Sequence, residues 1–135
     1  DYAVLKVPKL KGKAIPLAKE LAAAGTPAVV LGYPGGGGLA ASPAVILEQL
    51  TALGRNIYDR GNTARDVYEF RGNVRQGNSG GPLINKEGEV IGVVFAQSAT
   101  YDDIGYALTN NETRADTATA IAQNQTFSSG RCAAN

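Results

Sequence analysis

Histidine is absent from this chain of 135 residues, and cysteine occurs only once, at Cys132. A metal site built on these two residue types is therefore not expected, and the carboxylates show no metal-ligand spacing. The glycine-rich run at residues 33–38 (YPGGGG) lacks the Lys-Ser or Lys-Thr pair of a phosphate-binding loop. We therefore expect neither a metal ion nor an organic cofactor.

Net charge and long apolar runs are also scarce. The formal net charge is +1, which gives no electrostatic reason to expect binding to nucleic acid or to an anionic membrane. No apolar run approaches the roughly 18 residues that a membrane-spanning helix needs. The chain opens inside a segment, residues 1–7, that is typical of a strand, so we expect it to be part of a longer protein.

The length and the 17 glycines favour one β-rich domain over residues 1–135. The alanine-rich run from Asn111 predicts a C-terminal helix with Asn111 as its N-cap. A short helical turn is predicted at residues 18–24, ended by Gly25, and a polar loop at residues 54–65. Apolar or alternating runs predict strands at residues 2–7, 27–32, 44–53, 66–71, 83–85, 90–95 and 104–108.

Strands this short, joined by glycine-rich turns, hide their edges best by closing on themselves. The sequence therefore predicts an all-β fold, an antiparallel barrel of six to seven strands with a C-terminal α-helix.

The segment RQGNSGGPL, residues 75–83, has the composition of a nucleophile loop. A serine that attacks a carbonyl must project from a tight turn, with backbone N–H groups aimed at the developing oxyanion. Gly77 can take the positive φ that turns its N–H toward that oxygen, and the N–H of Ser79 follows two residues later. The alternative is a glycine-rich hairpin without chemistry. A serine nucleophile also needs a base, usually histidine.

This loop resembles the nucleophile loop of the trypsin-like (chymotrypsin-fold) serine proteases, and its Asn before the serine is close to the bacterial HtrA-type version. The runs VVLGYPGGG, DVYEFR, QGNSGGPL, GEVIGVVFA and IGYALT follow the order of the C-terminal barrel in that two-barrel fold. GYPGGG, DVYEFRGNVRQGNSGGPL and VIGVVFA are most similar to actinobacterial membrane-anchored periplasmic proteases. The resemblance covers nearly the whole chain and implies a polypeptide substrate.

The resemblance implies a role for each residue that matches the family's motif. Ser79 would be the nucleophile, and Asp1 would orient a histidine and stabilise its imidazolium. The N–H groups of Gly77 and Ser79 would form the oxyanion hole. The histidine matches no residue here, because in this family it lies upstream, in the N-terminal barrel. Asn78 replaces the aspartate that pairs with a newly cut N-terminus in digestive enzymes, and it has no charge for that pairing.

The resemblance also implies which residues bind the substrate. These are the pocket base, the residue before Gly77, the strand after the hairpin and the residue facing it: Asn73, Gln76, Phe95, Ala96, Gln97 and Gly105. Asn73 is uncharged, so the sequence places no acidic group at the base to pair with Lys or Arg. We therefore expect a small or apolar side chain at the cleavage position.

Composition alone leaves two interpretations of Cys132 open, a free thiol or a bridge to a partner segment. Actinobacterial relatives carry a cysteine near the C-terminus that bridges to the upstream half, so the resemblance favours a disulfide to the missing half. It also implies a periplasmic location and a membrane anchor in the full-length protein.

The function expected from the resemblance is that of a serine endopeptidase with a Ser-His-Asp triad. This chain would carry the Ser and the Asp but not the His, so the isolated chain is expected to be inactive. Its partner would be the N-terminal barrel of the same protein, and without that barrel the exposed surface favours a dimer of the fragment. The alternative is a catalytically dead module that uses the barrel to bind peptides.

Overall fold

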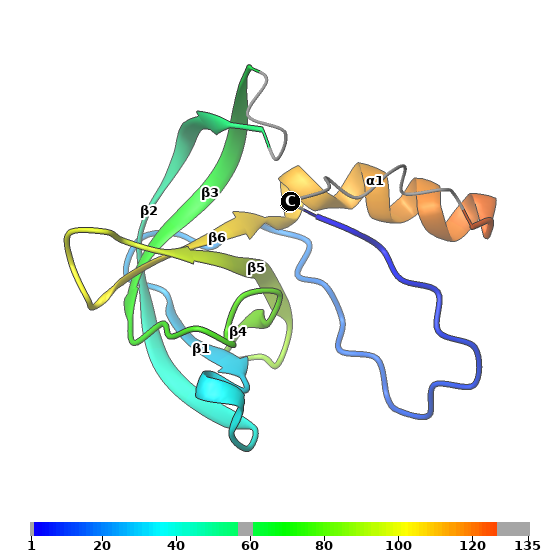
Figure 1. Cartoon of the computed structure of the whole chain (residues 1–135), viewed down its shortest axis with the longest axis horizontal. Helices are drawn as coiled ribbons and strands as arrows, with labels where there is room; N and C mark the ends of the chain where they lie inside the picture. Colours follow the sequence, from blue (N-terminus) through cyan, green and yellow to red (C-terminus); the bar gives the residue numbers. More distant parts are fainter. Residues whose placement is uncertain (1, 57–60, 127–135) are drawn as a thin grey trace, which may run out of the picture.

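The computed structural model describes residues 2–56 and 61–126. Six strands form a closed antiparallel barrel in the order β1-β2-β3-β6-β5-β4, and one helix follows the last strand (Figure 1). The all-β barrel with a C-terminal helix is therefore confirmed. The elements are β1 (Pro27–Gly32), η1 (Pro34–Gly36, a 3₁₀ turn), β2 (Ala40–Arg55), β3 (Asn62–Gly72), β4 (Pro82–Asn85), β5 (Val90–Gln97), β6 (Ile104–Thr109) and α1 (Asn110–Gln123).

The barrel closes because β1 pairs with β2 on one side and with β4 on the other. Closure leaves no strand at an open edge of this sheet. Alternate residues of each strand point inward, as in β2, where Ala44 and Ile46 are buried and Val45 is exposed. The side chains that fill the interior are fully or almost fully buried and come from all six strands: Val30, Ile46, Tyr68, Phe70, Leu83, Ile91, Val94 and Ala107.

The hairpin of β2 and β3 extends beyond the rest of the barrel (Figure 1). Residues 54–65 were predicted to be a polar loop, but the ladder continues as far as the pair Arg55↔Asn62, so that prediction is wrong at both ends. The reason is that this part of the ladder holds no buried residue, so it accepts polar side chains. The Gln49 amide, for example, donates to the Asp66 carboxylate across the two strands at 2.8 Å. Residues 57–60 lie outside the described part of the chain.

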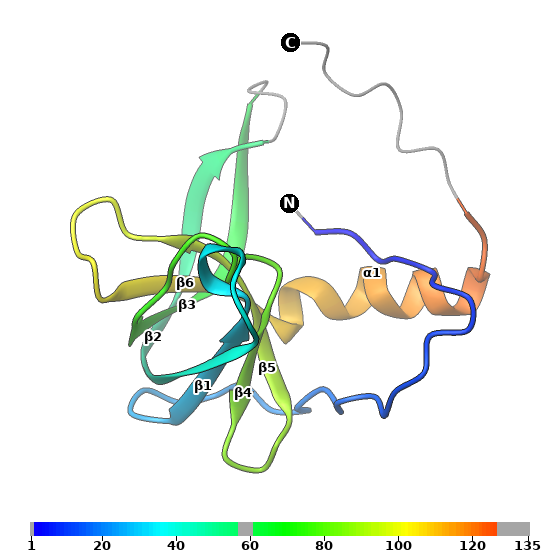
Figure 2. The same ribbon diagram turned by 60° about the horizontal axis from the view of Figure 1, so that its bottom comes forward.

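The N-terminal arm, residues 2–26, contradicts two predictions. Residues 2–7 form no strand, since the closed barrel offers them no edge to pair with. Instead the start of the arm lies beside α1 (Figure 2), where the Tyr2 hydroxyl and the Thr117 hydroxyl are 2.5 Å apart. Residues 18–24 form no helical turn, because the arm pairs in extended form with the start of β5. Ala18 N–H donates to Val90 O at 2.9 Å, and Val90 N–H donates to Pro16 O at 2.8 Å.

The helix α1 begins one residue before the predicted N-cap. Thr109 is the cap, and its hydroxyl oxygen accepts a hydrogen bond from Glu112 N–H at 3.3 Å. The same hydroxyl donates to the Asp66 carboxylate at 2.9 Å, so a contact with β3 decides where the helix starts. Asn110 is buried and donates to the carbonyls of Ala18 and Val90, which ties the arm to the barrel.

Among the described residues there is no helix long and apolar enough to cross a membrane.

The Tyr68 hydroxyl links the core to the arm, and it makes stability depend on pH. It accepts a hydrogen bond from Ala22 N–H at 2.8 Å. Burial raises the pKa of Tyr68 above its ordinary value, the Asp66 charge adds to the rise, and the hydrogen bond from Ala22 opposes it. The folded state thus holds this proton more tightly than the unfolded state. The stabilisation is complete below the unfolded pKa of about 10 and is lost as the pH rises toward the folded pKa.

We therefore expect Tyr68→Phe to lower the free energy of unfolding by about 0.5–1.5 kcal/mol near neutral pH. The difference between wild type and variant should shrink above about pH 10. Urea unfolding at several pH values measures it, with Tyr101→Phe, at an exposed tyrosine, as control. A difference that stays constant up to the highest pH would contradict this account.

Candidate active site

The predicted nucleophile, Ser79, lies on the loop of residues 73–81 between β3 and β4, which we call the Ser79 loop. Its side chain is exposed, and its hydroxyl donates to the carbonyl of Phe95 on β5 at 3.4 Å. This is a long and therefore weak hydrogen bond, so a better acceptor, such as a neutral imidazole, could take its place. The hydroxyl is accessible and has no stronger partner among the described residues.

The loop is held against β5 by backbone hydrogen bonds on the C-terminal side of Ser79. Gly80 N–H donates to Val94 O at 2.8 Å, and Val94 N–H donates to Gly81 O at 2.9 Å. Gly81 N–H also donates back to Asn78 O, which tightens the turn around the serine. A Cβ at Gly81 would lie 2.2 Å from Leu31 O, so this position admits only glycine.

On the N-terminal side the loop is held by residues 33–39, which we call the glycine loop. Gly35 N–H donates to Gln76 O at 2.8 Å, and Tyr33 N–H donates to Gly77 O at 3.2 Å. The C=O and N–H of a trans peptide point in opposite directions. Anchoring Gln76 O on Gly35 therefore turns the N–H of Gly77 away from the glycine loop.

The two N–H groups predicted for the oxyanion hole, those of Gly77 and Ser79, donate to no residue in the described part of the chain. The N–H of Asn78, which lies between them, instead donates a hydrogen bond to Arg75 O at 3.0 Å. Gly77 has φ +99°, a conformation that glycine adopts readily and other residues rarely. The loop thus combines an exposed hydroxyl with two unused donors two residues apart.

Gly77→Ala is expected to damage the loop and leave the barrel folded. The new Cβ would lie 2.2 Å from Tyr33 O, in a backbone conformation unfavourable for alanine. In a form of the protein that includes the expected histidine-bearing N-terminal barrel, we expect kcat to fall about 10²- to 10³-fold, the usual loss of one oxyanion donor. Gly88→Ala is the matched control, because Gly88 also has positive φ but its Cβ would meet nothing within 4 Å. An equal effect of both variants on kcat would refute the assignment.

Asn78 is buried, and its Oδ1 is a side-chain oxygen without a hydrogen-bond partner among the described residues. It packs against Gly32, where a Cβ would lie 2.8 Å from Oδ1. A buried acceptor without a donor costs about 1–3 kcal/mol. The backbone around Asn78 therefore holds this side chain in place without help from a hydrogen bond to its Oδ1 among the described residues.

Two of the predicted substrate-binding residues, Asn73 and Gln97, line one hollow of about 440 Å³. Arg75 Nε donates to Asn73 Oδ1 at 3.3 Å, and Gln97 Nε2 donates to Asp102 O at 2.9 Å. The other residues that line this hollow are Val74, Arg75, Asp102 and Asp103. Gln76, another predicted substrate-binding residue, is exposed on the nucleophile loop.

Sequence reasoning missed the two carboxylates in this hollow, because they come from the turn before β6, which lies far along the chain from Asn73. The Asp103 carboxylate forms an exposed ion pair with Arg71 at 3.4 Å, and the Arg75 guanidinium lies in the same lining as Asp102. The lining therefore carries both signs of charge. The two acidic residues stand directly before β6, the strand that faces the nucleophile loop. That position in the sequence could have identified them.

Phe95 and Ala96 are half-buried on β5, and Phe95 is the residue that contacts Ser79. Gly105 is buried on β6, where a Cβ would lie 2.5 Å from a Val74 methyl carbon and 2.6 Å from the Phe70 ring. Val74 and Phe70 therefore already fill the space directly above Gly105. Asp1 and Cys132 lie outside the described residues, so their predicted roles stay predictions.

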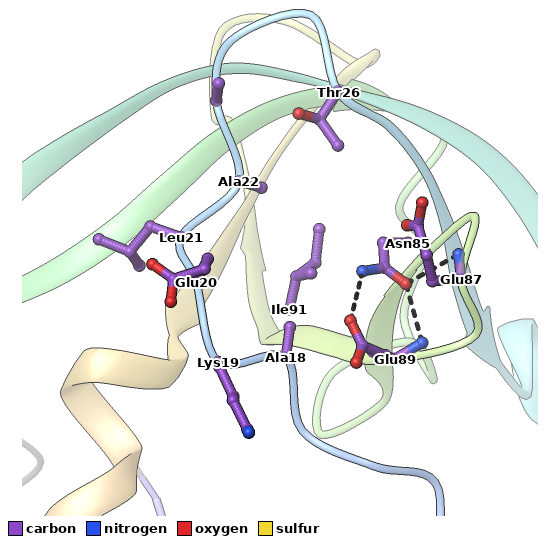
Figure 3. A pocket seen from close by; sticks show the side chains of 11 residues that line it. Ala18, Lys19, Glu20, Leu21, Ala22, Thr26, Asn85, Glu87, Glu89 and Ile91 are labelled. Carbon is purple, nitrogen blue, oxygen red and sulfur yellow. Dashed lines mark hydrogen bonds between the residues drawn. The ribbon is translucent and has the colours of Figure 1, made fainter.

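A hollow of about 500 Å³ shares no lining residue with the loop of residues 73–81. It lies between the arm and the β4–β5 turn, with Ile91 pointing into it (Figure 3). The Asn85 side chain in this lining is used by the turn itself, because Oδ1 accepts from Glu87 N–H and Glu89 N–H, and Nδ2 donates to the Glu89 carboxylate. These contacts stabilise a hairpin.

Within residues 2–56 and 61–126, no group of three or more carboxylate, His or Cys side chains is placed to hold a metal.

Comparison of the sequence with known proteins identifies the family to which this loop and barrel belong. The model of the trypsin-like peptidase domain matches residues 1–93, and the chain belongs to this family of serine proteases. Serine protease Rv3671c of Mycobacterium tuberculosis is 43% identical over 133 residues, which are 98% of this chain and 33% of that protein. The putative serine protease HhoA of Synechocystis is 32% identical over 121 residues, 85% of this chain and 29% of that protein. The chain thus spans about a third of the length of these curated relatives.

A solved structure shows the same fold. The crystal structure of the Rv3671c protease in its active form superposes with a TM-score of 0.86 at 41% identity, covering 94% of this chain and 56% of that one. The predicted resemblance to trypsin-like serine proteases is confirmed, and the chain is similar to a mycobacterial member of that family.

Proposed function

We propose that this chain is the nucleophile-bearing half of a serine endopeptidase that cleaves polypeptides through a Ser-His-Asp triad. The observation that carries the proposal is the loop geometry: the exposed Ser79 hydroxyl beside the unused N–H groups of Gly77 and Ser79. Membership of the trypsin-like family supports it. The histidine comes from the N-terminal barrel of the same protein, since this chain has none.

The chemistry proceeds in two stages. Ser79 Oγ attacks the scissile carbonyl carbon, and the histidine removes the hydroxyl proton as the bond forms. The N–H groups of Gly77 and Ser79 stabilise the oxygen that becomes negative. The histidine then gives its proton to the leaving amine, and water hydrolyses the acyl-enzyme with the same base. In this proposal Asp1 orients the histidine and stabilises its charged form.

For the residue on the N-terminal side of the cleaved bond we propose a small or apolar preference. Val74 and Phe70 occupy the space above Gly105, which supports a shallow site. The lining of the neighbouring hollow mixes Arg75 with Asp102 and Asp103, which gives no strong bias toward one charge. A peptide library in which only this residue varies tests the preference, and efficient cleavage after Lys or Arg alone would reject it.

Turnover of peptide substrates tests the proposed function. The isolated chain should show no hydrolysis above background, and the chain joined to its histidine-bearing barrel should hydrolyse peptides. A joined form that is folded, binds peptides and never cleaves them would support the peptide-binding module instead.

The partner barrel is expected to cover the N-terminal arm. Leu5 and Leu10 on the arm are 81% and 77% exposed, and Val4 and Leu5 border a hollow of about 250 Å³ against Ile121 of α1. Such a group of exposed apolar side chains is typical of an interface.

Without the partner barrel, the isolated chain should associate with itself through these side chains. We expect its sedimentation coefficient to rise with concentration, and Leu5→Ser combined with Leu10→Ser to suppress the rise. Leu53→Ser, at an exposed leucine of the β2–β3 hairpin, is the control. Self-association that the arm variant leaves unchanged would place the interface elsewhere.

We further propose that the full-length protein is periplasmic and membrane-anchored, with Cys132 bridged to the upstream half. The resemblance to actinobacterial periplasmic proteases supports this. Thiol alkylation of the full-length protein with and without reductant tests the bridge, and a Cys132 that is alkylated equally in both states would exclude it.

A further inference from the structure

Another hollow, of about 370 Å³, adjoins the nucleophile itself. Ser79, Gly77 and Gly81 form one side of it, and Pro82, Tyr33 and Leu39 are among the residues that complete the lining. None of its lining side chains is charged. A volume of this size is at the lower end of what small-ligand sites occupy.

Two large apolar side chains at this hollow are left exposed by the described part of the chain. Tyr33 is 57% exposed and Leu39 is 64% exposed, and both belong to the glycine loop. Covering them removes apolar surface from water, which is worth about 25 cal/mol per Å². A charged group placed here would lose water without gaining a partner.

The hollow lies on a defined side of the nucleophile. The loop contacts β5 through Ser79, Gly80 and Gly81, whereas it contacts the glycine loop through Gln76 and Gly77. The Ser79 loop thus lies between β5 and the glycine loop. A peptide whose N-terminal part follows Phe95–Gln97 and whose carbonyl meets Ser79 continues toward Tyr33 and Leu39.

We propose that this hollow binds an apolar side chain of the substrate on the C-terminal side of the cleaved bond, and that Tyr33 and Leu39 set this preference. The inference rests on the proposed endopeptidase function and names the substrate class for the same site: polypeptides with a large apolar residue at the first or second position after the cleaved bond. In the reaction, this part of the peptide departs with the leaving amine, which takes the proton from the histidine.

The test uses the histidine-bearing protein and quenched-fluorescence peptides that differ only at those two positions. We expect kcat/KM for Leu or Phe to exceed that for Ala, and those for Lys and Glu, by about 10-fold or more, as for a side chain filling an apolar pocket. Leu39→Ser and Tyr33→Ala should reduce the Leu/Ala ratio severalfold, and Tyr33→Phe should restore it. Leu53→Ser, at a leucine 77% exposed and outside this hollow, should leave it unchanged.

A reagent without a peptide on the leaving side separates this inference from the proposed function. A fluorophosphonate loses only fluoride, so its rate of reaction with Ser79 should be unaffected by Leu39→Ser. Normal labelling with an unchanged Leu/Ala ratio in both Leu39→Ser and Tyr33→Ala overturns the inference alone. Absence of labelling in the wild type overturns the proposed function instead. The partition of the acyl-enzyme between leucine amide and alanine amide as acceptors gives a second measurement, and equal partition also overturns the inference.

Discussion

Ser79→Ala in the histidine-bearing protein is expected to lower kcat by about 10⁴- to 10⁶-fold, the loss typical of removing a triad nucleophile. The hydroxyl makes one weak contact, with Phe95 O at 3.4 Å, so its removal costs the fold little. Binding of peptides should persist, because the barrel and the loop backbone stay in place. Steady-state hydrolysis measures the loss, and the midpoint of thermal unfolding confirms that the variant is folded.

Ser42→Ala is the matched control, because Ser42 lies on β2 opposite Val30 and outside the Ser79 loop. Its kcat should equal that of the wild type. A Ser79→Ala protein that keeps more than about a tenth of the wild-type kcat would show that another group attacks the substrate.

Phe70→Ala is expected to be the most damaging change to the barrel. The ring is fully buried in the core and also lies against Gly105, where it helps fill the space next to the nucleophile loop. Truncating a buried phenylalanine costs about 3–5 kcal/mol, from lost burial and the cavity left behind. A domain of this kind has a total stability of about 5–15 kcal/mol, so a large share of it should disappear.

Urea unfolding of the wild type and of Phe70→Ala measures this loss. Phe70→Leu should lose much less, since leucine refills most of the volume, and Tyr101→Ala, at an exposed side chain, should lose almost nothing. A change below about 1 kcal/mol for Phe70→Ala would mean that the core relaxes around the missing ring.

Local patterns predicted the barrel well where the signal is short-range. The compact apolar run at residues 27–32 coincides with β1 (Pro27–Gly32), and the hairpin of β4 and β5 lies where it was expected. The nucleophile loop was predictable because the local backbone conformation of a tight turn requires glycine. Gly77, for example, was expected to have a positive φ and has φ +99°.

The errors occur where distant contacts decide the structure. Residues 2–7 have the alternation of a strand, but a closed barrel gives them no edge. Thr109 caps the helix because Asp66, on another strand, holds its hydroxyl. The hydrogen bond from Gly35 to Gln76, which orients the peptide before Gly77, joins two glycine-rich loops, and no local pattern in either one predicts that they meet. The presence of Asp102 and Asp103 beside Asn73 has the same origin.

Covalent labelling by a fluorophosphonate, mapped by mass spectrometry to the modified residue, tests the central claim most directly. Three samples are compared: the isolated chain, the chain joined to its histidine-bearing barrel, and the joined form with Ser79→Ala. We predict that only the joined wild type is labelled, at Ser79, because the hydroxyl needs a base from outside this chain. A joined wild type that is folded but remains unlabelled, or an isolated chain labelled at the same rate, would contradict the account.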